Sequence, residues 1–406
     1  MRLLTLRNLQ SIQKQPDYDW VQQIFILRPD NLGDIILFTG ALRLIRKKFP
    51  NAEIIICAKN YIHSLLELCP YVDEIVSWEQ IMKLLPDWVP DFPGKWRVEA
   101  LIRKLRFMKT TWWDYRSDLY LLPVRSTVPD LHLFSSYSRA TVKLGISGDT
   151  NHQTAEEDQI QGKHYTARSH VDESEGIQHE LDTYIDFLKL LGIETNRDEI
   201  WPELWSSDED VHWAADRIPE SRDEIILAIA PGMTSITDKF YAAENYLKAL
   251  NGLKTERLSV YIFGSSSEIT QCKAVENELS KCEQIHSLQN FTGQTTIRQL
   301  LEMLKRCDVV LSNETGVLHM ATALRMPTVG ILGGGHHSRF YPWGDPNINL
   351  KADEPMDCYH CNWYCIHPTM RCIHEIKPEQ ITEKLQTLIH QIREKDAQKA
   401  SAEETK

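Results

Sequence analysis

Short β-branched runs alternate with helical patterns in both halves of the chain, and no other feature limits the fold as strongly. The predicted strands are residues 24–27, 53–58, 74–77, 225–230, 258–263, 309–311 and 328–332. A helix is predicted for residues 35–49, because Phe38, Leu42 and Ile45 recur at the spacing of one helical face. Strands that alternate with helices form parallel sheets covered by helices. Two such series predict an α/β protein with two doubly wound, Rossmann-like domains.

Chain length and polar segments indicate where these domains begin and end. With 406 residues and 42% hydrophobic content, the chain is long enough for two domain cores. We predict one domain over residues 1–205, a second over residues 206–390 and a flexible tail at residues 391–406. The charged stretch Gly148–Glu175 is predicted to be a loop or a mobile insertion.

Charge and hydropathy argue against two classes of protein. The chain carries 45 basic and 57 acidic residues, a net charge of −12, which argues against a general nucleic-acid binder. No uncharged apolar run reaches the roughly 18 residues of a membrane span, and the N-terminus lacks a signal-peptide pattern. We therefore expect a soluble, cytoplasmic protein. The basic, aromatic residues 93–113 predict either a solvated helix face or a patch for peripheral association with a membrane surface or glycolipid.

The stretch "LRPDNLGD", residues 27–34, follows the first predicted strand. A strand, a glycine-containing turn and a helix place such a loop at the carboxyl edge of a parallel sheet, where open α/β folds bind ligands. Asp34 would lie at the start of the helix, where the helix dipole favours a charged carboxylate. It is predicted to be either a helix cap or a base that accepts a proton.

Two stretches of the second half indicate a phosphate site. In "APGMTSITDKF", residues 230–240, hydroxyl side chains and Lys239 follow a predicted strand, although a lone lysine is usually a surface residue. In "LSNETGVLHMATALRMPTVGILGGG", residues 311–335, a glycine opens a helix whose first amides can bind an anion. His319 lies one turn inside that helix and is predicted to face the ligand rather than the core. The run Gly333–Gly335 is expected to leave backbone exposed nearby.

Together these motifs resemble glycosyltransferase family 9, the ADP-heptose:lipopolysaccharide heptosyltransferases. The matching stretches are "LRPDNLGDIILFTGALRLIRKKFPNAEI", "PGMTSITDKFYAAENYLKAL", "FTGQTTIRQLLEMLKRCDVVLSNETGVLHMATALRMPTVGILGG" and "CIHEIKPEQI", in family order. The resemblance implies a GT-B fold, in which two Rossmann-like domains face each other across a cleft. The first domain would bind the acceptor and the second the nucleotide sugar, and catalysis would need no cofactor.

The resemblance also implies roles for individual residues. Asp34 corresponds to the general base that deprotonates the acceptor hydroxyl. The implied donor-binding residues are Thr234, Ser235, Lys239, Glu268, Glu314, Thr315, Gly316 and His319. The chain departs from the family at Glu314, where Asp is usual, and at Asn31, where a basic or small residue is common. These departures leave the donor sugar and the acceptor contacts open.

Four cysteines crowd into the segment of residues 357–373, within "CYHCNWYCIHPTMRC". They are Cys358, Cys361, Cys365 and Cys372. This spacing suits a tetrahedral thiolate site for a structural metal, with zinc as the default and iron as the other candidate. The alternative is four reduced thiols in a packed loop. The neighbouring His360, His367 and His374 could each replace one cysteine as a ligand.

The sequence therefore predicts an inverting glycosyltransferase that moves heptose, or a similar sugar, from an ADP-sugar to a cell-surface glycan or lipopolysaccharide precursor. One alternative acceptor is a bacterial surface protein, which would make the chain a protein O-heptosyltransferase. Another alternative is a catalytically silent protein that binds sugar nucleotides or assembles through its cysteines. The expected partners are an ADP-sugar donor and a glycan, glycolipid or protein acceptor, with no nucleic acid.

Overall fold

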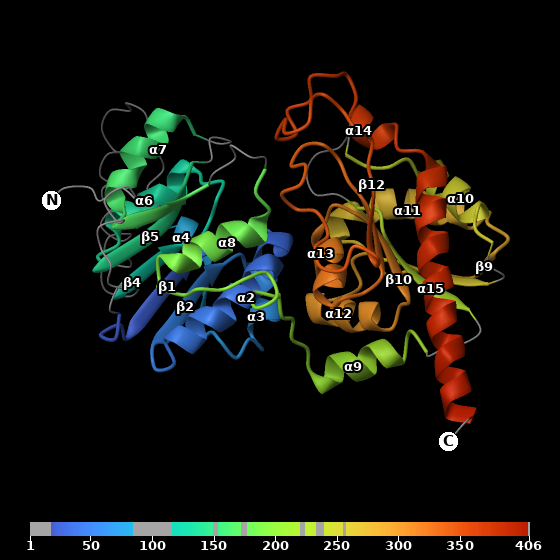
Figure 1. Ribbon diagram of the computed structural model, residues 1–406, viewed down its shortest axis with the longest axis horizontal. Helices are drawn as coiled ribbons and strands as arrows, with labels where there is room; N and C mark the ends of the chain where they lie inside the picture. The colour runs from blue at the N-terminus through green and yellow to red at the C-terminus, as the bar shows by residue number, and fades with distance from the viewer. Residues whose placement is uncertain are drawn as a thin grey trace. The chain divides into compact units, whose positions relative to one another are not determined.

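The chain divides into two compact units, Met1–Pro202 and Glu203–Lys406 (Figure 1). The structure is a computed structural model that describes residues 18–83, 116–148, 153–171, 177–219, 224–232, 239–254 and 257–404. Within these residues, no helix is both long and apolar enough to cross a membrane.

A parallel sheet forms the centre of the first unit, in the strand order β3-β2-β1-β4-β5-β6. Its strands are β1 (Gln23–Leu27), β2 (Glu53–Ala58), β3 (Glu74–Ser77), β4 (Leu119–Leu122), β5 (Val142–Ser147) and β6 (Ala167–His170). The central strands are apolar and buried on both sides, as expected for a parallel sheet with helices on both faces.

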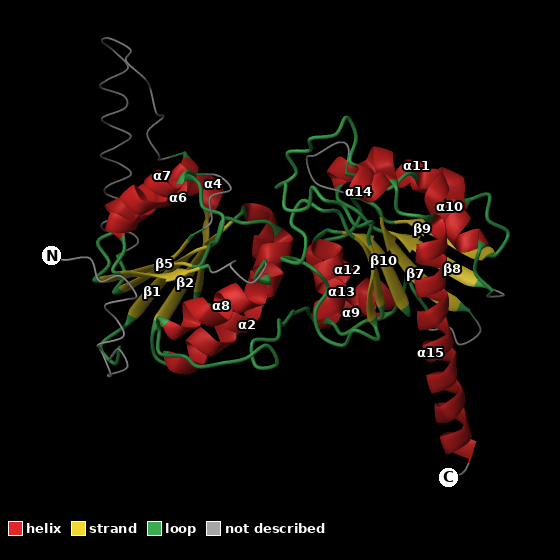
Figure 2. Ribbon diagram, turned by 45° about the horizontal axis from the view of Figure 1, so that its top comes forward, coloured by secondary structure: helices red, strands yellow, loops and turns green. Residues whose placement is uncertain are grey.

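Helices cover both faces of this first sheet. They are α2 (Leu32–Lys48), α3 (His63–Leu66), α4 (Trp78–Met82), α6 (Pro129–Tyr137), α7 (Ala155–Gln161) and α8 (Glu180–Lys189). Helices α2 and α8 lie on one face, and α4, α6 and α7 lie on the other (Figure 2). In α2, Phe38, Leu42 and Ile45 are fully buried, so the predicted apolar face of this helix is confirmed.

The second unit repeats the design, with the strand order β12-β11-β10-β7-β8-β9. Its strands are β7 (Ile225–Ala230), β8 (Leu258–Ile262), β9 (Ile285–Asn290), β10 (Val309–Asn313), β11 (Thr328–Ile331) and β12 (Asn349–Ala352). Its helices are α9 (Asp208–Ala215), α10 (Ala243–Asn251), α11 (Ile269–Leu279), α12 (Ile297–Lys305), α13 (Gly316–Ala323), α14 (Arg371–His374) and α15 (Pro378–Glu404). Helices α10 and α11 lie on the face opposite α9, α12 and α13 (Figure 2).

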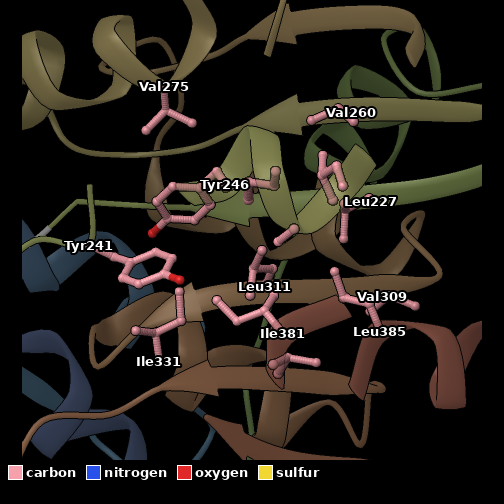
Figure 3. Packing of buried hydrophobic residues seen from close by; sticks show 14 of the residues in the cluster. Leu227, Tyr241, Tyr246, Val260, Val275, Val309, Leu311, Ile331, Ile381 and Leu385 are labelled. Carbon is pink, nitrogen blue, oxygen red and sulfur yellow. The ribbon is translucent and has the colours of Figure 1, made fainter. Parts of the chain in front are cut away.

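Aliphatic and tyrosine side chains fill the core between the second sheet and helices α10, α11 and α15 (Figure 3). The rings of Tyr241 and Tyr246 meet edge to face, with their centroids 5.4 Å apart. From α15, Ile381 and Leu385 are fully buried in the same cluster. The C-terminal helix is therefore part of this core.

Both sheets have the strand order of doubly wound folds, which confirms the predicted α/β class. In this order the chain reverses direction across the sheet at a switch point, between β1 and β4 in the first unit and between β7 and β10 in the second. Ligands bind in the crevice outside the carboxyl ends of the strands at such a point. The loops that follow these four strands are therefore where function is expected.

The prediction of a loop over Gly148–Glu175 is wrong where the structure describes this stretch. Residues 155–161 form α7, and residues 167–170 form β6, the edge strand that pairs with β5. A reciprocal cap begins α7, because the Glu157 amide donates to Thr154 Oγ1 and the Thr154 amide donates to Glu157 Oε2. This capping box is visible in the sequence as a threonine followed three residues later by glutamate.

Most residues of the predicted C-terminal tail are helical in the structure. Helix α15 extends to Glu404, through most of the residues for which a flexible tail is predicted. These residues are rich in Ala, Lys, Glu and Gln, which favour helix without any apolar face to bury.

A buried arginine joins the two sides of the first switch point. Arg28, at the end of β1, is 1% exposed, and its guanidinium donates to the carbonyl of Pro123, which follows β4. It also donates to the Tyr184 hydroxyl at 2.9 Å and forms an ion pair with Asp30 at 2.9 Å. Burial alone would lower the pKa of Arg28, but Asp30 and the other acidic groups around it raise that pKa. Arg28 therefore stays charged inside the fold.

Replacing Arg28 should destabilise the protein far more than replacing a surface arginine. Arg28→Met leaves Asp30, Tyr184 and the Pro123 carbonyl without their buried donor, which costs on the order of 3 kcal/mol. Arg197→Met removes a pair with Asp182 in which the arginine is 53% exposed, and should cost under about 1 kcal/mol. Urea unfolding of both variants measures the difference, and equal losses would contradict the role given to Arg28.

A buried histidine makes the stability of the first unit depend on pH. His132, in α6, is 1% exposed, and its ring nitrogens lie 3.0 Å from the Tyr165 hydroxyl and 2.9 Å from Thr127 Oγ1. Burial, with the nearby positive charge of Arg168, lowers the pKa of His132 from 6.5 to about 4. The folded protein therefore holds this ring neutral at pH values where the unfolded chain protonates it.

Stability should fall as the pH drops from 6.5 towards 4, because the unfolded chain takes up a proton that folded His132 refuses. The contribution is full above pH 6.5, and its loss amounts to at most about 3 kcal/mol. The urea midpoints of the wild type and of His132→Gln at pH 7 and pH 5 test this. Carboxylates titrate equally in the two proteins, so a difference in their pH dependence comes from His132. The variant should show the smaller pH dependence, and an equal dependence would disprove the assignment.

Candidate functional site

Asp34 occupies the position predicted for it, in the first turn of α2 directly after the switch-point loop. Its side chain is half-buried, and its backbone carbonyl accepts a hydrogen bond of 3.1 Å from Arg28. Asn31 precedes the helix as its N-cap residue, without a side-chain capping bond. The buried guanidinium therefore fixes the backbone that carries the Asp34 carboxylate.

The loop after the neighbouring strand β2 adds two polar side chains that sequence reasoning missed. Lys59 donates to the side-chain oxygen of Asn31 at 2.8 Å, and the Leu32 amide donates to the Tyr61 hydroxyl at 3.1 Å. Partial burial raises the pKa of Tyr61 to about 12, and the negative charge of Asp34 adds to this shift. A carboxylate, an ammonium group and a phenol thus gather at one edge of the first sheet.

In the second unit, Asn313 joins the two loops of the switch point. It ends β10, is 1% exposed, and its amide donates to the Pro231 carbonyl after β7 at 2.7 Å. The Tyr246 hydroxyl donates to the Asn313 side-chain oxygen at 3.0 Å. The predicted "APG" and "NETG" stretches are therefore held together, as the fold requires.

Lys239 and Glu314 lie close enough to influence each other's charge. Lys239 is 8% exposed, and burial lowers its pKa while the negative charge of Glu314 opposes this shift. Burial raises the pKa of Glu314, and the positive charges of Lys239 and Arg339 oppose it. Arg339, 6% exposed, is a further cation that sequence reasoning missed. The side chains of Lys239 and Arg339 are thus both buried and lie near the carboxyl group of Glu314.

Thr315 and Gly316 lie where they are predicted to lie. Thr315 is the N-cap residue of α13 and Gly316 is its first residue. The first amides of a helix have no partner within the helix and attract anions. Next to two buried cations, this helix start can stabilise a phosphate group.

The other predicted donor residues have structural partners of their own. Glu268 accepts from the Ser265 amide at 2.6 Å and lies against Gly232, where an added Cβ would come within 2.3 Å of its carboxyl carbon. His319 is 5% exposed, and its ring stacks on Trp343 with the centroids 6.0 Å apart. Thr234 and Ser235 lie outside the described residues, as does the basic segment 93–113.

The expectation of exposed backbone at Gly333–Gly335 is wrong. All three glycines are buried, and side chains of the cysteine-rich segment cover them. An added Cβ would lie 2.2 Å from a Tyr359 ring atom at Gly334 and 2.2 Å from a Trp363 ring atom at Gly335. The glycines are needed because two aromatic rings pack directly on the backbone, and the sequence alone does not show which rings these are.

The four cysteines of residues 357–373 line one pocket, together with Trp363, His367 and Met370. Cys372 is buried, and Cys358, Cys361 and Cys365 are partly exposed. Among the described residues, no three His, Cys, Asp or Glu side chains are arranged to hold a metal ion. The donor set is that of a thiolate metal site, while the side chains do not have the geometry of a formed one.

Comparison with known proteins places these features in a family. The model of glycosyltransferase family 9 (heptosyltransferase) matches residues 139–364. The chain is 26% identical over 165 residues to lipooligosaccharide heptosyltransferase 2 of Campylobacter jejuni, an alignment that covers 40% of this chain and 51% of that protein. It is 19% identical over 378 residues to lipopolysaccharide heptosyltransferase 2 of Escherichia coli, covering 91% of this chain and 99% of that protein. The chain thus spans about half the length of the first of these relatives and nearly all of the second.

Solved structures show the same fold. A family 9 glycosyltransferase from Veillonella parvula matches with a TM-score of 0.70 and 17% identity, over 93% of this chain and 100% of the other. The Escherichia coli ADP-heptose lps heptosyltransferase II matches with a TM-score of 0.66 and 17% identity, over 92% and 100%. The predicted GT-B fold is confirmed, and the match to more than half of the sequence shows that the chain belongs to glycosyltransferase family 9, the heptosyltransferase family.

Proposed function

We propose that this chain transfers heptose, or a similar sugar, from an ADP-sugar to a lipopolysaccharide or related glycan precursor, with inversion at the anomeric carbon. The observation that carries the proposal is the pair of switch points. One presents the carboxylate of Asp34, and the other presents Lys239 and Arg339 beside the start of α13. The named relatives are lipooligosaccharide and lipopolysaccharide heptosyltransferases, which supports the choice of donor and acceptor.

The reaction is a single displacement. Asp34 accepts the proton of the acceptor hydroxyl as that oxygen attacks the anomeric carbon, and the bond from this carbon to the diphosphate oxygen breaks. The departing ADP gains negative charge, which Lys239 and the first amides of α13 stabilise. No cofactor takes part in catalysis.

The remaining family-derived roles belong to the same proposal. Thr234 and Ser235 bind the donor diphosphate, Glu268 binds the ribose, and Thr315, Gly316 and His319 face the phosphates and the sugar. Glu314 is one methylene longer than the Asp usual in the family, so it reaches further into the donor site. A membrane-bound acceptor brings the protein to the inner face of the membrane as a peripheral protein.

Asp34→Asn should abolish most of the turnover and leave donor binding intact. Loss of a general base lowers kcat by roughly 100-fold or more, whereas the amide keeps the shape of the side chain. The assay follows release of ADP from ADP-heptose with a lipopolysaccharide precursor as acceptor, beside calorimetric binding of ADP. The matched control is Glu74→Gln, an exposed carboxylate at the amino end of β3.

Wild-type turnover by Asp34→Asn would disprove the assignment of the base. Transfer to a co-purifying protein, with none to the lipopolysaccharide precursor, would disprove the proposed acceptor. If the protein binds ADP but transfers sugar to no acceptor, it is a catalytically silent binding protein and not an enzyme.

We also propose that Cys358, Cys361, Cys365 and Cys372 bind one structural zinc or iron ion. The four cysteines line one pocket, and four thiolates are a complete ligand set for such an ion, which supports this proposal. The ion would fasten the cysteine-rich segment to the Gly333–Gly335 turn and would take no part in the transfer.

Metal analysis of the purified full chain should find about one zinc or iron per chain. The variant Cys361→Ser/Cys365→Ser should lose this metal, while Cys282→Ser, a buried cysteine outside the pocket, should keep it. Thiol titration measures the complementary quantity, the number of cysteines that are free to react. Four reactive thiols in the metal-free wild type, with no metal bound on addition of zinc or iron, would show that the segment is a loop of reduced cysteines.

A further inference from the structure

An aromatic ring of the cysteine-rich segment lies directly over the lysine of the candidate donor site. The Lys239 ammonium nitrogen is 3.4 Å from the centroid of the Trp363 ring. Lys239 is almost completely buried, so its charge depends on the few groups that surround it. These two residues are far apart in the sequence and become neighbours only in the fold.

Several contacts fix the position of Trp363. Its indole packs on the Gly333–Gly335 turn, where an added Cβ at Gly333 or Gly335 would lie 2.6 or 2.2 Å from ring atoms. The indole nitrogen donates to His336 Nδ1 at 3.3 Å, and the Asn362 amide donates to the Gly335 carbonyl at 3.0 Å. The face, the edge and the backbone of Trp363 are all fixed by these contacts. The indole can therefore hold a group that packs against it in a defined position.

The backbone around the ring is in an unfavourable conformation. His360, Asn362 and Trp363 have φ angles of 69°, 49° and 66°, in the left-handed region that favours glycine. Such residues cost free energy and persist where the surroundings over-determine them, commonly at ligand sites. This strained turn places the Trp363 ring against the Lys239 ammonium group.

An aromatic face is a suitable partner for a lysine that binds a phosphate. The ring attracts the ammonium group through its quadrupole, which is worth more when the cation is desolvated. The ring is neutral, so it adds no further negative charge to that of the nearby Glu314 and leaves N–H donors of the lysine for an anion.

We propose that Trp363 is a positioning residue for the donor: it holds the Lys239 amino group in a fixed direction for the diphosphate of the nucleotide sugar. The inference rests on the proposed function, which makes Lys239 a diphosphate ligand. It gives the cysteine-rich segment a role in donor binding, because the same indole is also a wall of the cysteine-lined pocket.

The test is a double-mutant cycle on calorimetric ADP binding by the full chain. Trp363→Leu should weaken ADP binding roughly tenfold, and Trp363→Phe should restore most of the loss, because phenylalanine keeps an aromatic face. In the Lys239→Ala background, Trp363→Leu should have almost no further effect, since the group that it holds is gone. The matched control is Tyr364→Leu, an aromatic residue of the same segment that is 73% exposed.

Each outcome separates the inference from the function on which it rests. If Trp363→Leu weakens ADP binding equally with and without Lys239, Trp363 only supports the fold of the segment, and the inference is wrong. Full ADP affinity of Trp363→Leu also overturns it. If Lys239→Ala alone leaves ADP affinity unchanged, the donor site itself is misplaced. Circular dichroism and the urea midpoint of each variant show that the comparison is between folded proteins.

Discussion

In each sheet, one buried polar side chain links the two loops of the switch point and so fixes the positions of the residues around it. There the helices that follow adjacent strands leave for opposite faces of the sheet, so the two loops diverge and expose backbone carbonyls. Arg28 donates to the Pro123 carbonyl in the first unit, and Asn313 donates to the Pro231 carbonyl in the second. A buried donor is costly unless it is satisfied, so each bridge fixes its loops in one arrangement.

The chemistry of the site follows from these bridges. Arg28 also donates a hydrogen bond to the backbone carbonyl of Asp34. The backbone of the candidate base is therefore held by an arginine that is only 1% exposed. Asn313 directly precedes Glu314 and the start of α13. Its hydrogen bonds with Tyr246 and the Pro231 carbonyl therefore fix the backbone that leads into the candidate anion site. The Lys239 ammonium nitrogen lies 3.4 Å from the centroid of the Trp363 ring. Base and cations are thus placed by contacts that form only on folding.

The sequence predicts what depends on neighbouring residues and misses what depends on distant ones. Strands β1, β2 and β3, helix α2 and the positions of Asp34, Thr315 and Gly316 follow from local apolar patterns and turn residues. Strand β6 is missed because an edge strand needs little apolar character, and the cover of Gly333–Gly335 is missed because its rings come from elsewhere in the chain. The roles of Arg28 and Trp363 cannot be predicted, since their partners become neighbours only in the fold; an arginine at the end of a buried apolar run is the one available signal.

The proposed function requires the second switch point to bind the diphosphate of an ADP-sugar through Lys239. Calorimetric titration of wild type and Lys239→Ala with ADP-heptose, UDP-glucose and GDP-mannose tests it most directly. ADP-heptose should bind the wild type most tightly of the three, and Lys239→Ala should bind it roughly tenfold or more weakly, as expected for loss of a charge-assisted phosphate contact. Equal affinity for all three nucleotide sugars, or unchanged affinity in the variant, would contradict it.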